Sequence, residues 1–217
     1  MNLLILSATE GEVSILKDHL QKTPGTQHNI TMVVAGVGLI ATTFALTREL
    51  STHKYDMVIQ AGVGGSFDES IQLGEVVQVI SERYGDLGAE DHDKYIDIFD
   101  MGLIDANIHP HSNSVLGVIP TAITDNTGLR KVTGLTINTV SGNEQTIARR
   151  KELYNCQVES MEGAALHFVC LQMEMPFMQV RGISNYVIPR DKSKWQMKDA
   201  IINLNNWLIR FLENAEQ

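Results

Sequence analysis

Three polar side chains lie beside predicted strand ends or helix starts, and their chemical types suit the cleavage of a nucleoside. Glu12 follows the apolar segment 2–8, Glu162 precedes an apolar run, and Asn185 follows the apolar segment 177–183. An ionised carboxylate can accept hydrogen bonds from two adjacent ribose hydroxyls and can stabilise the positive charge that develops on a sugar during glycosidic cleavage. An amide nearby can bind the purine. The pattern therefore indicates nucleoside chemistry.

Glu162 is predicted in the first turn of a helix that spans 161–173. Ser160 is a favourable N-cap for the apolar run that follows it. The unpaired N–H groups and the dipole of a helix start favour an ionised carboxylate. Glu162 is thus suited to hold a ribose, although an acid in the first turn also commonly serves only to complement the dipole.

Asn185 is expected at the carboxyl end of a short strand, 177–183, with Ser184 beside it. In open α/β sheets, ligands bind at the carboxyl ends of the strands. An asparagine there presents a donor and an acceptor to the edge of a 6-oxopurine, whereas an aspartate could donate a proton to the base. The alternative is an asparagine that only forms a turn.

Glu12 has two possible roles that compete. The segment 2–8 is predicted as a strand and 10–21 as a helix, and Thr9 with Glu12 fits a capping box. Glu12 would also lie at the same strand-end rim as Asn185, where it could act as a general base for water. A carboxylate bonded back to its own cap is less free to catalyse.

Alternating strands and helices predict one α/β domain over residues 1–217, a three-layer sandwich whose central mixed sheet is flanked by helices. The predicted strands are 2–8, 30–35, 56–61, 74–82, 115–119, 134–140, 156–159 and 177–183. The predicted helices are 10–21, 39–52, 143–153, 161–173 and 195–214. The stretch from Glu82 to Asp105 is rich in acids and is expected to be a solvated loop or an edge packed on a second subunit.

Segments along nearly the whole chain resemble the purine nucleoside phosphorylase and nucleosidase superfamily. The segment 7–13 is similar to the one that bears the catalytic acid of methylthioadenosine nucleosidases, which implies that role for Glu12. The segment 60–66, with Gly62 and Val63, is similar to a glycine-rich turn at the substrate. Met161 and Glu162 match the pair that holds the ribose. The segment 181–185 matches the strand end that touches the base.

One departure from that resemblance narrows the implied substrate. Methylthioadenosine nucleosidases carry an aspartate where this chain has Asn185, and an amide accompanies 6-oxopurines in the superfamily. The segments 85–103 and 184–191 resemble those of futalosine hydrolases, which release hypoxanthine from futalosine on a route to menaquinone. The carboxylated aryl ketone of futalosine would need a cation, for which Arg190, Lys192 and Lys194 are the candidates.

Hydrolysis is favoured over phosphorolysis by the residues themselves. Phosphate needs compensating positive charge, but this chain has Gln60 and Val63 where phosphorylases of the superfamily carry an arginine and a serine, and the segment 9–16 offers two acids and no arginine. We expect a futalosine hydrolase with Glu12 as the base for water. A methylthioadenosine or adenosylhomocysteine nucleosidase and a nucleoside sensor without turnover are the alternatives.

No cofactor or metal is expected. The segment 32–41 fits the G-x-G-x-x-A dinucleotide fingerprint, but Asp56 precedes the next strand when it should end it. We therefore interpret these glycines as forming a tight turn beside the nucleoside. The acids and histidines of 90–93 and 109–111 have ligand chemistry, yet consecutive loop side chains rarely converge on one ion.

Composition limits the partners of the chain. A net charge of −9 and a pI near 5.2 argue against nucleic acid and anionic membranes. Two cysteines, Cys156 and Cys170, form no disulfide pattern, and no signal peptide or spanning segment is predicted, so we expect a cytoplasmic enzyme. A small-molecule nucleoside and a homodimer or larger homo-oligomer are the expected partners.

Overall fold

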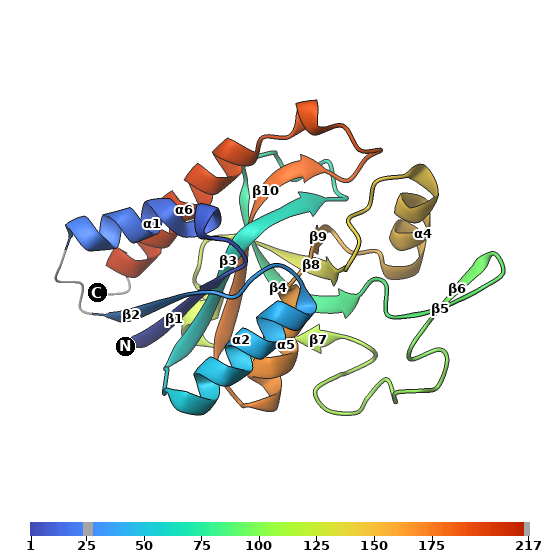
Figure 1. Cartoon of the computed structure of the whole chain (residues 1–217), viewed down its shortest axis with the longest axis horizontal. Coiled ribbons are helices and arrows are strands. Elements are labelled where there is room, and N and C mark those ends of the chain that lie inside the picture. The colour runs from blue at the N-terminus through green and yellow to red at the C-terminus, as the bar shows by residue number, and fades with distance from the viewer. Residues whose placement is uncertain (24–27, 215–217) are drawn as a thin grey trace.

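The structure is a computed structural model that describes residues 1–23 and 28–214 (Figure 1). Its strands are β1 (Asn2–Ser7), β2 (Asn29–Val34), β3 (Met57–Ser66), β4 (Val76–Tyr84), β5 (Gly88–Asp91), β6 (Lys94–Asp97), β7 (Leu116–Gly117), β8 (Arg130–Thr136), β9 (Val158–Ser160) and β10 (Phe177–Tyr186). Its helices are α1 (Glu10–Lys22), α2 (Leu39–Thr52), α3 (Ala122–Asp125), α4 (Glu144–Tyr154), α5 (Gly163–Gln172), the 3-10 turn η1 (Lys192–Lys194) and α6 (Met197–Asn214).

The main sheet is mixed and partly closed on itself. Its strand order is β10-β4-β8-β9-β3-β1-β2, and β10 also pairs with β3. Strands β3, β10, β4, β8 and β9 thus form a closed circuit of pairings. β1 pairs in parallel with β2 and β3, whereas β10 runs antiparallel to β4 and β9 runs antiparallel to β3. The carboxyl ends of β1, β3 and β10 consequently meet at one rim of the sheet.

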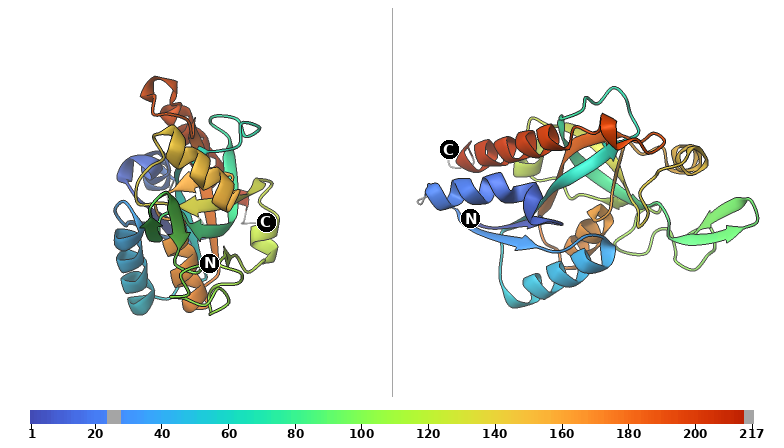
Figure 2. Two further views of the ribbon diagram at one scale, coloured as in Figure 1. Left: turned by 90° about the vertical axis from the view of Figure 1, so that its right-hand side faces the viewer. Right: turned by 45° about the horizontal axis from the view of Figure 1, so that its top comes forward.

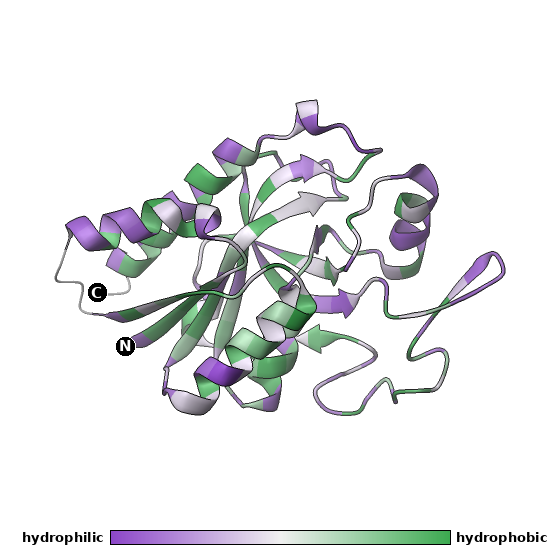
Figure 3. Ribbon diagram, in the orientation of Figure 1, coloured by the Kyte–Doolittle hydropathy of each residue, from purple (hydrophilic) through white to green (hydrophobic). Residues whose placement is uncertain are grey.

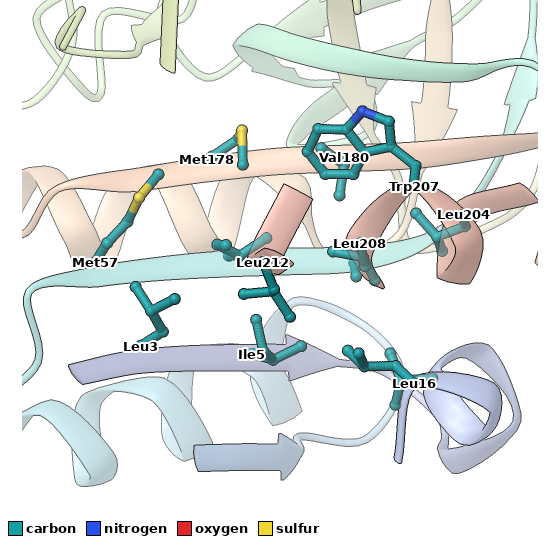
Figure 4. Close-up of a cluster of buried hydrophobic side chains, with 13 residues drawn as sticks. Leu3, Ile5, Leu16, Met57, Met178, Val180, Leu204, Trp207, Leu208 and Leu212 are labelled. Atoms are coloured by element: carbon teal, nitrogen blue, oxygen red, sulfur yellow. The ribbon is translucent and has the colours of Figure 1, made fainter. Parts of the chain in front are cut away.

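Helices cover both faces of this sheet, which gives the three-layer sandwich predicted from the sequence. Leu3 and Ile5 of β1 pack against α1 and α6, whereas the alternate residues Leu4 and Leu6 pack against α2 and α5. Figure 2 shows α1 and α6 side by side, and Figure 4 shows the core beneath them. Figure 3 shows that hydrophobic residues concentrate in the central strands and that the tip of the β5–β6 hairpin is hydrophilic.

Two predicted element boundaries were wrong in ways that affect the site. The segment 60–66 is not a turn, because β3 runs to Ser66 and pairs with β10 on one side and β9 on the other. β10 likewise extends past its predicted end and includes both Ser184 and Asn185. Pairing on both sides holds these glycines extended despite their low strand propensity.

The acidic stretch from Glu82 to Asp105 is only partly the predicted loop. Its middle forms the β5–β6 hairpin, which extends away from the main sheet (Figure 1). Glu82 itself is in β4 and is 1% exposed. The prediction of a solvated segment was therefore wrong for Glu82, because β4 is paired on both sides at this residue, with Leu116 of β7 and with Gly134 of β8.

Ser160 ends β9 and is not the N-cap of the next helix. Thr136 of β8 lies opposite Ser160 in the parallel β8–β9 ladder, so the backbone is extended there. Glu162 occupies the N-cap position, and α5 begins at Gly163, two residues later than predicted. The hydroxyl of Ser160 nevertheless accepts the N–H of Gly163 at 3.4 Å. Sheet pairing thus places Glu162 just before the helix.

Candidate active site

A cavity of about 420 Å³ opens at the rim where β1, β3 and β10 end. Six of the residues predicted to form the site line it: Glu12, Val63, Met161, Glu162, Ser184 and Asn185. Two others, Gly62 and Arg190, do not line it. The remaining wall is largely apolar and includes Val37, Ile137, Val140, Trp195, Met197 and Ile201. The structure therefore brings most of the predicted residues into one cavity.

Glu12 both caps α1 and faces the cavity. Its Oε2 accepts the backbone N–H of Thr9 at 2.9 Å and the hydroxyl of Thr9 at 3.0 Å, which confirms the capping box. Its Oε1 accepts the backbone N–H of Val63 at 3.0 Å. A carboxylate has about four lone-pair sites, so Oε1 keeps one for a further donor. The capping bonds thus orient a carboxylate that can still accept a proton.

Glu162 is fixed by the glycine loop between β2 and α2. Its Oε1 accepts the backbone N–H of Gly38 at 3.0 Å. Gly36 and Gly38 have φ values of 93° and 92°, a conformation that favours glycine. The glycines that resemble a dinucleotide fingerprint therefore form a tight turn, and this turn presents an N–H group to a buried carboxylate.

Arg181 lies beneath the cavity between the two carboxylates. It is 1% exposed, its Nη2 donates to Gln60 Oε1 at 2.7 Å, and its Nη1 is 3.5 Å from Glu162 Oε2. A Cβ on Gly62 would collide with Arg181 Nη1 and would stand 2.9 Å from Glu12 Oε1. Gly62 is therefore needed to let this charge approach the two acids.

Arg181 was not among the residues predicted to form the site. A signal was present, because Arg181 is the one charged residue within the predicted strand 177–183. A cation in a buried strand needs a partner, but the sequence does not reveal which of the acids it would meet.

Asn185 and Ser184 are hydrogen-bonded to each other near the carboxyl end of β10. The hydroxyl of Ser184 donates to Asn185 Oδ1 at 2.8 Å, and Asn185 Nδ2 donates to the carbonyl of Tyr186 at 3.0 Å. These bonds hold the amide in one orientation. Each of its polar atoms retains the capacity for one more hydrogen bond.

The predicted cations lie outside the cavity wall. Arg190 is exposed, and its guanidinium is 5.4 Å from the ring centroid of Trp195, which lines the cavity. Lys192 and Lys194 are exposed on η1, where Lys194 is 3.7 Å from Asp191. Within the cavity lining itself, the charged residues are Glu12, Glu159 and Glu162.

Glu159 is the third carboxylate of the cavity, and it was not among the predicted site residues. It is 4% exposed, and Ser141 donates to it through both its N–H and its hydroxyl. Burial raises the pKa of Glu159, and the hydrogen bonds from Ser141 and the charge of Arg150 oppose that rise. The sequence contains this residue within the segment that precedes Glu162, but it does not show the direction of the side chain.

Glu82 lies deeper, under the start of α5. It accepts hydrogen bonds from the Thr136 hydroxyl and from Gln179 Nε2, both at 2.9 Å, and Thr136 in turn accepts the N–H of Ala164 at 2.7 Å. Burial raises the pKa of Glu82 to about 7. A Cβ on Gly163 would collide with Glu82 Oε1, so a glycine is required after Glu162.

Residues 1–23 and 28–214 contain no group of three or more His, Cys, Asp or Glu side chains that could hold a metal ion. They also contain no helix long and apolar enough to cross a membrane.

Residues 2–213 match the Phosphorylase superfamily. The chain belongs to this superfamily. It is 28% identical to the 5′-methylthioadenosine/S-adenosylhomocysteine nucleosidase of Colwellia psychrerythraea, over 96% of this chain and 94% of that protein. It is 30% identical to the futalosine hydrolase of Streptomyces coelicolor, over 72% of this chain and 65% of that protein.

Solved structures of both kinds of enzyme share the fold. The S-adenosylhomocysteine nucleosidase of Streptococcus pyogenes, in complex with 5-methylthiotubericidin, superposes with a TM-score of 0.81 at 20% identity, over 99% of this chain and 97% of that one. The futalosine hydrolase of Helicobacter pylori superposes with a TM-score of 0.79 at 16% identity, over 99% and 98%. The fold alone does not distinguish the two substrates.

Proposed function

We propose that this protein hydrolyses the N-glycosidic bond of futalosine and releases hypoxanthine. The observation that carries the proposal is the convergence of Glu12, Glu162 and Asn185, from three distant segments, on one cavity of the superfamily fold. Both futalosine hydrolases and methylthioadenosine nucleosidases are among its relatives. Both groups support hydrolysis of an N-glycosidic bond, whereas the choice of futalosine as the substrate is based on the residues of the cavity.

Each of these three residues has a separate role in the proposed reaction. Glu162 accepts hydrogen bonds from the ribose hydroxyls and stabilises the positive charge that grows on the sugar as the bond to the base breaks. Glu12 takes a proton from water, whose oxygen bonds to the anomeric carbon. Hypoxanthine leaves with the electron pair and gains a proton, which balances the one removed from water. Asn185 binds the departing base.

Water suits this cavity better than phosphate. The charged residues in its lining are carboxylates, which repel a multiply charged anion. Arg181 is engaged by Gln60 and Glu162 beneath the floor. We therefore expect base release at full rate in phosphate-free buffer, with free sugar as the product. A strict requirement for phosphate, with a sugar 1-phosphate formed, would overturn hydrolysis.

The proposed substrate follows from Asn185 and from the apolar wall. An amide at this position has no proton to give an adenine leaving group. The side chains of Trp195, Met197 and Ile201 offer an apolar surface for an aryl 5′ group, and Arg190 above Trp195 is a candidate for its carboxylate. The alternative, a methylthioadenosine or adenosylhomocysteine nucleosidase, is favoured by the longer alignment with the Colwellia enzyme.

One assay separates these functions. The purified protein is incubated with futalosine, inosine and methylthioadenosine, with and without phosphate, and the released bases are quantified by chromatography. We expect hypoxanthine from futalosine as the fastest release. Fastest release of adenine from methylthioadenosine would favour the alternative enzyme, and binding without any release would favour a sensor. A cytoplasmic location is proposed with this function.

We also propose that the protein is a homo-oligomer that pairs through α2. Ile40 and Phe44, one helical turn apart, are 86% and 65% exposed, and Val34 and Val37 next to them are 52% and 55% exposed. Val37 also lines the cavity, so a partner on this surface would cover its mouth. Phe44→Glu is expected to reduce the mass measured by light scattering, while Leu103→Glu, at a 68% exposed position elsewhere, leaves it unchanged.

A further inference from the structure

The start of α5 is capped by a residue of another strand and not by its own N-cap residue. Glu162 occupies the N-cap position, but its carboxylate accepts none of the N–H groups of α5, a helix that the structure describes in full. The N–H of Ala164 is bound by the hydroxyl of Thr136 in β8, at 2.7 Å. Thr136 is 0% exposed. A buried hydroxyl from β8 therefore replaces the side chain that usually caps a helix.

This cap removes a competitor for the Glu162 carboxylate. The unpaired N–H groups and the dipole of a helix start attract a carboxylate that lies next to them. The N–H groups of Ala165 and Leu166 bind the carbonyl of the N-cap residue, and that of Gly163 lies 3.4 Å from a serine hydroxyl of β9. The N–H of Ala164 would therefore be open to the carboxylate if the β8 hydroxyl did not bind it.

Glu82 fixes the direction of the Thr136 hydroxyl. The single hydrogen of this hydroxyl is donated to Glu82 Oε2 at 2.9 Å, which leaves a lone pair of Oγ1 for the N–H of Ala164. Gly134 lies opposite Glu82 in the β4–β8 ladder, and a Cβ on either Gly134 or Gly163 would collide with Glu82 Oε1. Two glycines from separate elements thus make room for the acid that orients the cap.

The Glu162 carboxylate is consequently available to the cavity. Its Oε1 accepts the N–H of Gly38 at 3.0 Å, its Oε2 is 3.5 Å from Arg181 Nη1, and the residue lines the cavity. Each carboxylate oxygen has two lone pairs, so each keeps one for a ribose hydroxyl.

We propose that Thr136, oriented by Glu82, is a positioning residue for the reaction, because it binds the first turn of α5 and leaves the Glu162 carboxylate free for the ribose. The inference rests on the proposed role of Glu162. Without the hydroxyl, the N–H of Ala164 loses its partner, and an unpaired buried donor is costly. The carboxylate then turns back to this N–H and withdraws from the ribose.

The test compares ligands that differ only in their ribose hydroxyls. C-nucleoside analogues of inosine and adenosine join base and sugar by a carbon–carbon bond that is not hydrolysed, and their 2′,3′-dideoxy derivatives lack the two hydroxyls. Calorimetry gives each Kd, and the ribose preference is the Kd of the dideoxy ligand divided by that of the ribose ligand. We expect a preference of at least about 10-fold in the unmodified protein. Thr136→Val, which keeps the shape without the hydroxyl, is expected to lower it by about 5-fold or more and to change the dideoxy Kd by less than about 3-fold.

Two matched variants separate positioning from stability. Thr136→Ser restores the hydroxyl and is expected to keep the ribose preference within about 2-fold. Thr124→Val removes another buried threonine hydroxyl, which accepts the N–H of Thr121 at 2.8 Å at the start of α3 and does not line the cavity. It is expected to lower Tm and to leave the preference unchanged. If Thr124→Val reproduces the loss of preference, or if Thr136→Val weakens both ligands equally, Thr136 has only a structural role.

The outcomes also separate this inference from the proposed function. A ribose preference that depends on Thr136, in a protein that hydrolyses no nucleoside, supports the inference and refutes the hydrolase. Hydrolysis of futalosine with an unchanged preference in Thr136→Val does the reverse. Absence of a ribose preference in the unmodified protein, for both analogues, overturns the inference. Should Thr136→Val fail to fold, a crystal structure of the unmodified protein with a bound analogue decides: Glu162 on the ribose with Thr136 on Ala164 supports the inference, and Glu162 on Ala164 overturns it.

Discussion

Replacing Glu12 by glutamine tests both proposed roles of its carboxylate, as the general base for water and as the cap of α1. The carboxylate accepts from Thr9 N, Thr9 Oγ1 and Val63 N. A glutamine has one acceptor oxygen, so in either orientation its NH₂ group faces a donor. If the oxygen keeps the bonds to Thr9, the N–H of Val63 loses its partner in a nearly buried site, since Glu12 is 8% exposed.

Two magnitudes follow from this geometry. An unsatisfied buried donor costs about 1–3 kcal/mol, which for a domain of this size lowers Tm by about 2–12 °C. Loss of the general base lowers kcat by about 10²–10⁴-fold. Affinity for a nucleoside analogue that cannot be hydrolysed is expected to change little, because the substitution retains the shape of the side chain.

The assay compares Glu12→Gln with Glu10→Gln, the same change in the same helical turn. Glu10 is exposed and pairs with Lys17 on the surface, so its variant is expected to keep the Tm and the turnover of the unmodified protein. Hydrolysis of futalosine and thermal unfolding are measured on all three proteins. A Glu12→Gln protein with a lowered Tm but near-normal turnover would show that Glu12 only caps α1, and the proposed mechanism would be refuted.

Three further outcomes are expected. Glu162→Gln lowers both turnover and nucleoside affinity, because its carboxylate holds the ribose as well as the developing charge; unchanged affinity, measured by calorimetry, would argue against ribose binding. Asn185→Asp raises the ratio of kcat/KM on methylthioadenosine to that on futalosine, and an unchanged ratio would place base selection elsewhere. The raised pKa of Glu82, about 7 against 4.5, means that the folded state binds its proton more tightly. The resulting stability is full below pH 4.5 and is lost as pH rises through about 7, by on the order of 3 kcal/mol; denaturant unfolding at pH 5 and pH 8 should show this loss, and Glu82→Gln should reduce it.

The fold could be predicted where local signals and tertiary packing agree. The helix predicted over 39–52 matches α2, because its apolar periodicity and the preceding glycines both mark its start. The segment 60–66 was misjudged because glycines are typical of turns, and only pairing with two distant strands makes them extended. The β5–β6 hairpin was missed because half of its strand residues are charged and its strands carry no apolar alternation.

The site could be predicted in part for a similar reason. Glu12, Glu162 and Asn185 each follow a recognisable local pattern at the end of an element. Arg181 and Glu159 depend on which strands lie next to each other, because Gln60, the acceptor of Arg181, and Gly65, the residue opposite Glu159, both belong to the distant strand β3. A sequence does not reveal the register that sets Glu159 opposite Gly65. Residues whose role comes from cross-strand neighbours therefore stay hidden until the pairing is known.

The contact between Gly163 and Glu82 restricts the order in which this protein can change during evolution. A methyl group at position 163 has no room while Glu82 and Gln179 keep their places, because it would collide with Glu82 Oε1 and with Gln179 Nε2. The substitution of Glu82 by a shorter residue would have to precede the change at position 163. It would remove the carboxylate that accepts hydrogen bonds from Thr136 and Gln179. An alanine after Glu162 thus becomes accessible only after residue 82 has been shortened, which destabilises the core, and after the side chain of Gln179 has moved away. In descendants of this chain the two positions should change together, 81 residues apart in sequence, and the pair would mark a lineage more reliably than either residue alone.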